Sequence, residues 1–346
     1  MKKTILASVI AGLGVGLAGA ASAQSNVQVY GLIDTFLASE KNGPNSALKI
    51  DSGGMTTSFW GIKGTEDLGG GLKAVFALEA FIRNDTGDPG RFPGDPAFAR
   101  SSYLGLQGGF GQVQLGRNTT PYFVSTLLAN PFVDSFGFSP EILRTFGTRN
   151  YVIGDTGWAN SVLYSGNFGG VGLNAIYTFG DESFTTSSSG RGLGLSANYF
   201  AGPLMITGAF QTKNSSGVAP AKQNSFRLGG AYDFGVARVF ASYQTIKDRD
   251  GLVTAGLTNA DHNGFQVGVS APVGPGSVLF SYGTTKSDGV GGKGTRNVFA
   301  LGYDYNLSKR TDVYAAFYND SGDVALPSAA WQTKIQRIGV GLRHKF

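Results

Sequence analysis

The sequence predicts an all-β protein, a transmembrane antiparallel β-barrel of about 16 strands with short periplasmic turns, long extracellular loops and one loop folded into the lumen. Three observations predict this fold class. Apolar and polar residues alternate with period two along most of the chain, short turns alternate with long polar stretches, and aromatic residues recur where the alternating segments end.

The alternation is clear in several segments. Between residues 72 and 80, Leu72, Phe76 and Leu78 share one face, while Lys73 and Glu79 share the other. The segments 226–234, 263–271 and 296–305 repeat the pattern. Because successive side chains of a strand point to opposite sides, each segment predicts a strand with one apolar and one polar face.

Residues 1–23 predict a secretory signal peptide. Lys2 and Lys3 precede an apolar stretch at 5–18, and Ala-Ser-Ala ends at residue 23, so cleavage between Ala23 and Gln24 is expected to leave 24–346. A membrane-anchoring helix is the alternative, but the apolar run is short for a span. Without this segment's two lysines, 26 basic and 23 acidic residues remain, an excess of +3 that is too small to indicate nucleic-acid binding.

The remaining composition excludes several classes of protein. The chain has no cysteine, which rules out disulfides and thiolate sites. After residue 23 no run of 18 apolar residues predicts a membrane helix, and a closed barrel is the other structure that satisfies its backbone hydrogen bonds in lipid.

Turn and loop signals alternate along the chain. Short turns rich in Gly, Pro and Asn occur near 67–70, 108–111, 167–170, 200–203, 233–236, 272–276 and 307–310. The longer polar stretches are roughly 39–55, 83–97, 118–158, 180–191, 213–223, 247–262, 286–294 and 321–333. A soluble β-sandwich is the alternative, but its strands break at regular intervals without this strict alternation of short and long connections.

Aromatic pairs mark the strand ends, including Tyr177 with Phe179, Tyr232 with Phe234, and Tyr303 with Tyr305. Together they favour the interfacial girdles of a membrane barrel over ordinary strand packing.

The sequence offers little for catalysis. Only His262 and His344 are present, and neither has metal-ligand spacing. Asp261 and His262 with one of the many serines are the nearest approach to a triad, and a polar loop pair is the favoured reading. We therefore expect no enzyme activity, no metal and no cofactor.

The chain resembles the general porins of Gram-negative bacteria, especially the β-proteobacterial and neisserial type. The segments that carry the resemblance are VQVYGLIDTF, FWGIKGTEDLGGGLKAVFALE (59–79), SSYLGLQGGFGQVQLGRNTTP (101–121), NSVLYSG (160–166) and the last strand, which ends in Phe346. The resemblance implies an outer-membrane homotrimer of sixteen-stranded barrels that admits small hydrophilic solutes and ions. It also implies lipid and lipopolysaccharide as surroundings, and Phe346 as the signal read by the outer-membrane assembly machinery.

Residues 118–158 form the longest loop and are the expected constriction. The loop carries apolar side chains, among them Phe123, Phe132 and Phe138, that an exposed loop would not need. Folding inward against the wall would bury them, as the resemblance also implies. The alternative is an outward loop with an apolar surface patch.

Charged residues around that loop are expected to set ion selectivity. The candidate constriction residues are Lys63, Lys73, Arg83, Arg100, Arg117, Asp134, Glu141, Arg144 and Arg149. A solvated rim charge is the alternative for each arginine. Arg100 falls in phase with the apolar Leu104 and Leu106, so it reaches water only if a bulge or the strand end intervenes.

Two positions depart from the anion-selective relatives. Phe59 and Gly157 stand where those relatives often carry arginine, which thins the expected cationic ladder. The predicted function is a general diffusion porin with a weak anion preference. A substrate-specific channel with a lumenal binding ladder is the alternative, and a barrel enzyme and an adhesin are the remaining hypotheses.

Overall fold

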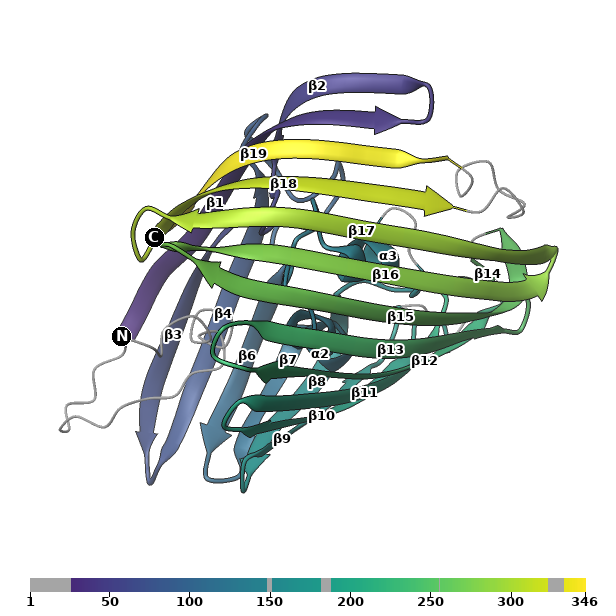
Figure 1. The fold of residues 1–346 in the computed structure, drawn as a ribbon. Helices are drawn as coiled ribbons and strands as arrows, with labels where there is room; N and C mark the ends of the chain where they lie inside the picture. Colours follow the sequence, from purple (N-terminus) through teal and green to yellow (C-terminus); the bar gives the residue numbers. More distant parts are fainter. Residues whose placement is uncertain (1–25, 148–150, 182–187, 255, 323–332) are drawn as a thin grey trace.

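A computed structural model describes residues 26–147, 151–181, 188–254, 256–322 and 333–346. Within these ranges nineteen strands form one continuous sheet, and three of them, β2 (Asn45–Ser52), β5 (Asp88–Pro89) and β14 (Val253–Thr254), belong to loops. The other sixteen (19 − 3) form the wall of a closed barrel (Figure 1). The expected leader at 1–23 lies outside the described residues.

The wall strands follow one another around the barrel in chain order. They are β1 (Asn26–Asn42), β3 (Phe59–Gly69), β4 (Leu72–Arg83), β6 (Ser101–Gly108), β7 (Gly111–Thr119), β8 (Gly157–Phe168), β9 (Val171–Thr178), β10 (Gly192–Ala201), β11 (Leu204–Asn214), β12 (Lys222–Asp233), β13 (Arg238–Arg249), β15 (Leu257–Val273), β16 (Gly276–Val290), β17 (Gly292–Asn306), β18 (Thr311–Gly322) and β19 (Ile335–Lys345). Every neighbouring pair is antiparallel, and β1 closes the ring against β19, from Leu32 opposite Lys345 to Asn42 opposite Ile335.

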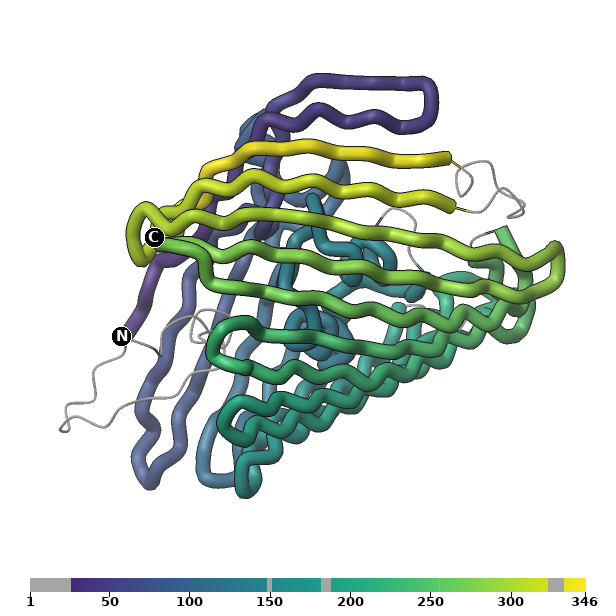
Figure 2. The backbone as a smooth tube through the Cα atoms, in the orientation of Figure 1, coloured from purple at the N-terminus to yellow at the C-terminus, as the bar shows by residue number. Residues whose placement is uncertain are grey.

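The strands are tilted, as barrel closure requires. Figure 2 shows the strands of the near wall, green to yellow, crossing the direction of those of the far wall, purple to teal. The described residues contain no helix that is long and apolar enough to cross a membrane.

The two ends of the barrel differ in their connections. At one end, two residues join β6 to β7, β8 to β9 and β10 to β11, where φ is positive at Gly169, Gly170 and Gly202. At the other end lie the long connections, including 120–156 between β7 and β8. The predicted asymmetry of turns and loops is therefore present.

Several expected loops are instead strand. The stretch 286–294 lies within the β16–β17 hairpin, which turns at Gly291 and Gly292, and most of 39–55 lies in the β1–β2 hairpin. Their polar residues suggested loops, but a strand that extends beyond an apolar belt carries polar residues on both faces while its ladder continues. The β1–β2 hairpin projects beyond the barrel wall (Figure 1).

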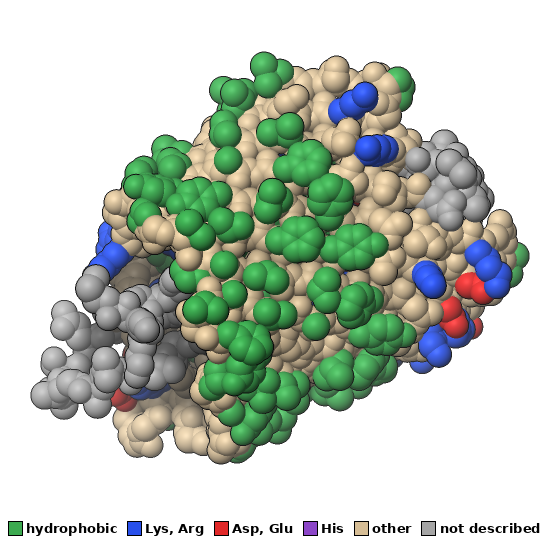
Figure 3. Space-filling view, in the orientation of Figure 1, with side chains coloured by type: hydrophobic (Ala, Val, Ile, Leu, Met, Phe, Trp, Pro, Cys, Tyr) green, Lys and Arg blue, Asp and Glu red, His purple; other side chains and the backbone are tan. Residues whose placement is uncertain are grey.

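The wall has an apolar outer face and a polar inner face. On β12, Phe226 and Leu228 are 45% and 52% exposed. Arg227, which lies between them, and Gln223, near the start of the strand, are buried. Figure 3 shows hydrophobic side chains, green, covering the middle of the outer surface over the near-wall strands. This inversion of a soluble core is the pattern expected of a barrel in lipid around a polar interior.

The long connection 120–156 folds into the barrel. It contains α2 (Pro121–Leu128) and α3 (Pro140–Phe146). Each helix has a hydroxyl residue at its N-cap, Thr120 or Ser139, whose side chain accepts a hydrogen bond from a backbone N–H, and a proline in its first turn. Helix α2 contacts β9 to β12, and α3 contacts β16 and β17. Phe132 and Phe138 pack with wall residues such as Phe36 and Tyr314, which explains why the loop is rich in phenylalanine.

Candidate functional site

A buried ion triad fastens α3 to the wall. Glu141 accepts hydrogen bonds from Arg144, at 2.7 Å, and from Arg227 on β12, and all three side chains have no exposed surface. Arg144 also donates to the Thr284 carbonyl and the Thr285 hydroxyl of β16, each at 2.8 Å. Burial alone would raise the pKa of Glu141, but Arg227 and Arg144 hold that pKa below its ordinary value. Glu141 and Arg144 therefore lie between the loop and the wall.

Asp134 lies on the same loop, next to a second cluster. Its carboxylate accepts a hydrogen bond from Thr56 at 3.2 Å, and Thr56 accepts one from Arg343 on β19. Burial raises the pKa of Asp134, while Arg100 and Arg343 act in the opposite direction. Arg343 is also bound to Asp304 and Asp312, so the loop carboxylate adjoins a charged part of the wall.

Arg100 points to the inner face of the barrel. Its guanidinium pairs with Glu79 of β4 and lies 3.9 Å from the ring centre of Phe59. Strand β6 begins only at Ser101, so the period-two phase of Leu104 does not extend to Arg100. The Phe59 ring therefore supports a guanidinium that comes from another strand end.

Arg117 lies beside Gly157, much as Arg100 lies beside Phe59. A β-bulge between Gly116 and Asn118 turns its side chain, which then bonds the Ala99 carbonyl and Asp155. A Cβ added at Gly157 would lie 3.7 Å from the Arg117 guanidinium. The missing side chain at 157 thus leaves room for an arginine supplied by the neighbouring strand.

Asp155 is shared with a residue that the sequence did not single out. Arg91 binds Asp155 through both terminal nitrogens, at 2.7 and 2.8 Å, and also binds Asp95 at 2.8 Å. Burial opposes the charged form of Asp155, but its bonds to Arg91 and the nearby Arg117 lower its pKa. No motif marks Arg91, because its partner lies 64 positions away in the chain.

The other predicted residues lie apart from these clusters. Lys63 lies 4.5 Å from the ring centre of Tyr30, Lys73 is half-buried near the short-turn end, and Arg83 pairs with Asp88 at 3.3 Å in a loop. Arg149 lies outside the described residues. Arg100 thus lies within electrostatic reach of Asp134, whereas Glu141 and Arg144 belong to the separate buried triad with Arg227.

His262 is part of a buried polar network. Its ring contacts Ser287 at 2.8 Å and Asp248 at 3.2 Å, whereas Asp261 pairs with Arg249 instead. Ser287, Asp248 and the ring are almost fully buried, which leaves no access for a substrate at the ring. The described residues contain no group of three or more His, Asp or Glu placed to hold a metal ion.

The network around His262 also holds the loop. Gln223 on β12 donates to Asp248 and to the Tyr151 carbonyl, and its own carbonyl accepts the Ile153 N–H at 2.9 Å. The Tyr151 ring lies 4.6 Å from His262. A structural role explains every contact of this histidine.

Phe346 lies at the closing seam. Its backbone N–H and carbonyl bond the carbonyl and N–H of Gly31, at 3.1 and 3.2 Å. Its ring is 45% exposed beside Gly31.

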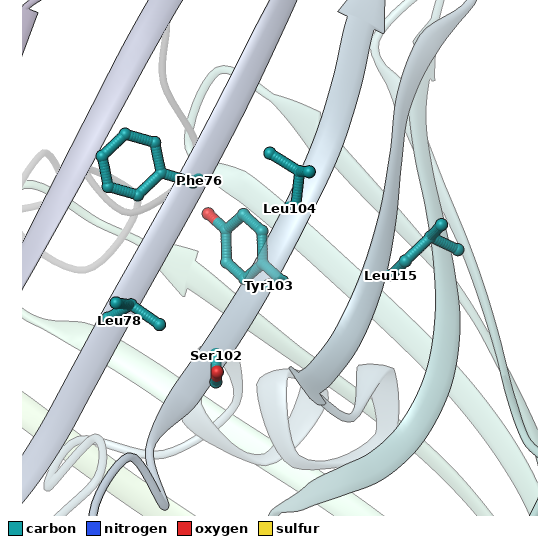
Figure 4. Close-up of a pocket in the computed structure, with 6 residues that line it drawn as sticks. All are labelled: Phe76, Leu78, Ser102, Tyr103, Leu104 and Leu115. Carbon is teal, nitrogen blue, oxygen red and sulfur yellow. The ribbon is translucent and has the colours of Figure 1, made fainter.

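A hollow of about 370 Å³ lies on the wall and not in the loop region. Phe76, Leu78, Ser102, Tyr103, Leu104 and Leu115 line it, on β4, β6 and β7 (Figure 4). Leu104 and Leu115 are 64% and 58% exposed on the outer face.

Comparison with known proteins gives one consistent result. The family model of the Gram-negative porins matches residues 6–325. Outer membrane porin protein 32 of Delftia acidovorans is 33% identical over 373 residues, covering 100% of both chains.

Solved structures give the same fold. The anion-selective porin from Comamonas acidovorans superimposes with a TM-score of 0.78 and 30% identity, over 93% of this chain and 100% of that one. The trimer form of OmpT, an outer membrane protein of Vibrio cholerae, gives a TM-score of 0.71 at 17% identity, over 93% and 99%.

Proposed function

The chain belongs to the Gram-negative porins, and we propose that it works as a general diffusion channel of the outer membrane with a weak anion preference. The observation that carries this proposal is the polar inner face of a sixteen-stranded wall, which is too wide for side chains to fill. Small hydrophilic solutes and ions would move down their gradients through water. Nothing in this mechanism requires catalysis or a cofactor.

We further propose that the loop 118–158 narrows the lumen and that Asp134 faces cations of the wall there. Arg100 and Arg343 both act on the Asp134 carboxylate, which supports opposed charges across the passage. Such a field orients polar solutes and favours one sign of ion without tight binding. In this scheme Glu141 and Arg144 anchor the loop to β12 and β16, and the pair of Arg91 with Asp155 anchors the C-terminal part of the loop.

Unpaired lysines support the anion preference. Lys63, Lys73, Lys213 and Lys345 lie on the inner side of their strands, and none forms an ion pair with a described residue. Arg100 and Arg117, by contrast, are neutralised by Glu79 and Asp155. The cationic excess is therefore small, and so is the expected preference.

A homotrimer is the proposed assembly. The exposed apolar side chains of β1, β3, β6, β7 and β19 are mostly aliphatic, for example Val29, Leu104 and Val340, with the ring of Trp60 on β3 among them, whereas those of β10 to β16 include many aromatic rings. Because aromatic girdles mark the lipid interface, a mostly aliphatic face with a hollow fits contact with another subunit. A structural neighbour in a trimer form supports the same assembly.

Single-channel recording in a planar bilayer tests the proposal. We expect conductance steps in groups of three and a current that does not saturate with solute concentration. In a tenfold KCl gradient, the reversal potential should have the sign of chloride selectivity and a magnitude well below the ~59 mV of a perfectly chloride-selective channel. Saturating flux would favour the substrate-specific channel. Folded protein without conductance would refute a channel of either kind.

A further inference from the structure

The connection between β2 and β3, residues 53–58, carries a hydroxyl that lies between two charges of the passage. The side chain of Thr56 donates a hydrogen bond to Asp134 of the inner loop at 3.2 Å. The same oxygen accepts a hydrogen bond from Nη1 of Arg343, on β19, at 2.9 Å. Asp134 forms no ion pair with any residue that the structure describes, so a neutral group separates the loop carboxylate from this wall cation.

A buried carboxylate fixes the backbone at Thr56. Oδ2 of Asp34, on β1, accepts the N–H groups of Met55 at 2.7 Å and of Thr56 at 2.8 Å. Oδ1 of Asp34 accepts the hydroxyl of Tyr314 at 2.5 Å, and the Asp34 carbonyl accepts the Gly53 N–H at 2.8 Å. Asp34 has no exposed surface, and these hydrogen bonds offset the cost of burying its charge. The position of Thr56 therefore depends on Asp34.

The inner loop is fastened to the same connection beside Asp134. The Gly54 carbonyl accepts the Ser135 hydroxyl at 2.6 Å and the Gly137 N–H at 3.1 Å. A Cβ at Gly137 would lie 2.5 Å from that carbonyl, so the close approach of the two segments requires glycine there. These bonds bring the Asp134 carboxylate to the Thr56 hydroxyl from the loop side.

Arg343 is held through its other two nitrogens. Nε donates to Asp312 at 3.0 Å, Nη2 donates to Asp304 at 2.8 Å, and the side chain is 14% exposed. If the Thr56 hydroxyl were absent, Nη1 of Arg343 and the Asp134 carboxylate would each lose a partner. A direct ion pair would then satisfy both, because an arginine and a carboxylate form strong, charge-assisted hydrogen bonds.

We propose that Thr56 is a selectivity-determining residue of this channel, which keeps Asp134 and Arg343 apart as separate charges. The inference rests on the proposed channel function and deepens it. A carboxylate and a guanidinium that stand apart act on a passing ion individually, whereas a close pair acts nearly as a neutral group. Thr56 and Asp134 are both partly exposed, as expected of residues that border an aqueous passage.

A double-mutant cycle between Thr56 and Asp134 tests the proposal. The readout is the chloride-to-potassium permeability ratio, taken from the reversal potential of the full-length protein in a planar bilayer under a KCl gradient. With threonine at position 56, Asp134→Asn should raise this ratio about twofold. In a Thr56→Ala background the same substitution should change the ratio by less than about 1.2-fold, because the carboxylate already pairs with Arg343.

Thr56→Ser is the matched control, because serine and alanine differ only by the hydroxyl oxygen. In the Thr56→Ser background, Asp134→Asn should again raise the ratio about twofold. A purely structural role of Thr56 would alter unfolding or conductance but would leave the effect of Asp134→Asn unchanged.

The outcomes separate this inference from the function on which it rests. If Asp134→Asn keeps its full effect in the Thr56→Ala background, or loses it equally in the Thr56→Ser background, the role of the hydroxyl is overturned and the channel is not. If Asp134→Asn has no effect in the otherwise unaltered protein, Asp134 does not act on passing ions, and the proposed field fails together with this inference. Folded protein without conductance would refute the channel itself.

Discussion

Replacing Glu141 by Gln tests whether the inner loop is held by a dry ion triad. The substitution keeps the shape of the side chain but removes the carboxylate that Arg144 and Arg227 share. Both guanidinium groups would remain in place with no exposed surface. Breaking one buried ion pair costs about 3–5 kcal/mol, and loss of the second pair puts the expected cost at the upper end of that range.

The assay is guanidinium chloride unfolding of the protein in detergent micelles. A matched control is Asp261→Asn, because Asp261 is the acid of an exposed pair with Arg249 and should cost less than ~1 kcal/mol. If Glu141→Gln costs no more than this control, water screens the triad, and the loop is not anchored as we have argued.

The pH dependence gives an independent check. Because the folded-state pKa of Glu141 lies below its ordinary value of 4.5, its stabilisation is fully present above pH 4.5 and is lost as the pH falls through the folded value. The Gln variant should lack this loss. A variant that retains the full acid destabilisation would assign it to other carboxylates.

Three further predictions concern separate parts of the barrel. Asp134→Asn should raise the chloride-to-potassium permeability ratio about twofold, because one charge ~7 Å from an ion contributes ~0.6 kcal/mol in water before salt screening. Since burial raises the pKa of Asp134, lowering the pH should produce the same change in the unaltered protein. The control Asp288→Asn, on the outer rim, should leave the ratio unchanged. Gly341→Ala should cost about 1–3 kcal/mol because its Cβ would overlap the Tyr314 ring, whereas Gly208→Ala, whose nearest atom is 3.8 Å away, should stay within about 0.5 kcal/mol. Phe346→Ala should lower the yield of barrel assembled in cells while refolding in detergent proceeds, and equal yields would remove its role as the assembly signal.

The wall could be predicted because its signal is local. Outward Phe226 and Leu228 alternate with inward Arg227 within a few residues, and a period of two assigns each side chain to a face. The same reasoning failed where polar residues continue a strand beyond the apolar belt, as at 286–294. There the ladder of backbone hydrogen bonds, which no side-chain pattern records, decides the structure.

The candidate site was only partly predictable. The apolar residues of the inner loop indicated burial, but its contacts join distant positions, such as Glu141 with Arg227 and Arg91 with Asp155. Arg100 and Arg117 escape the period-two rule through a strand end and a bulge, two backbone features that sequence spacing does not reveal. The sequence therefore indicates which charged residues lie near the loop more readily than it indicates which of them form ion pairs.

The seam between β1 and β19 has a consequence for the order of folding. Residues 293 (335 − 42) to 313 (345 − 32) positions apart form it, so neither edge of the growing sheet has a partner until the last wall strand arrives. Unpaired edges invite pairing with other chains, and contacts of such long range form slowly. The newly made chain therefore needs protection until closure, which also brings Phe346 to Gly31 at the end of the seam.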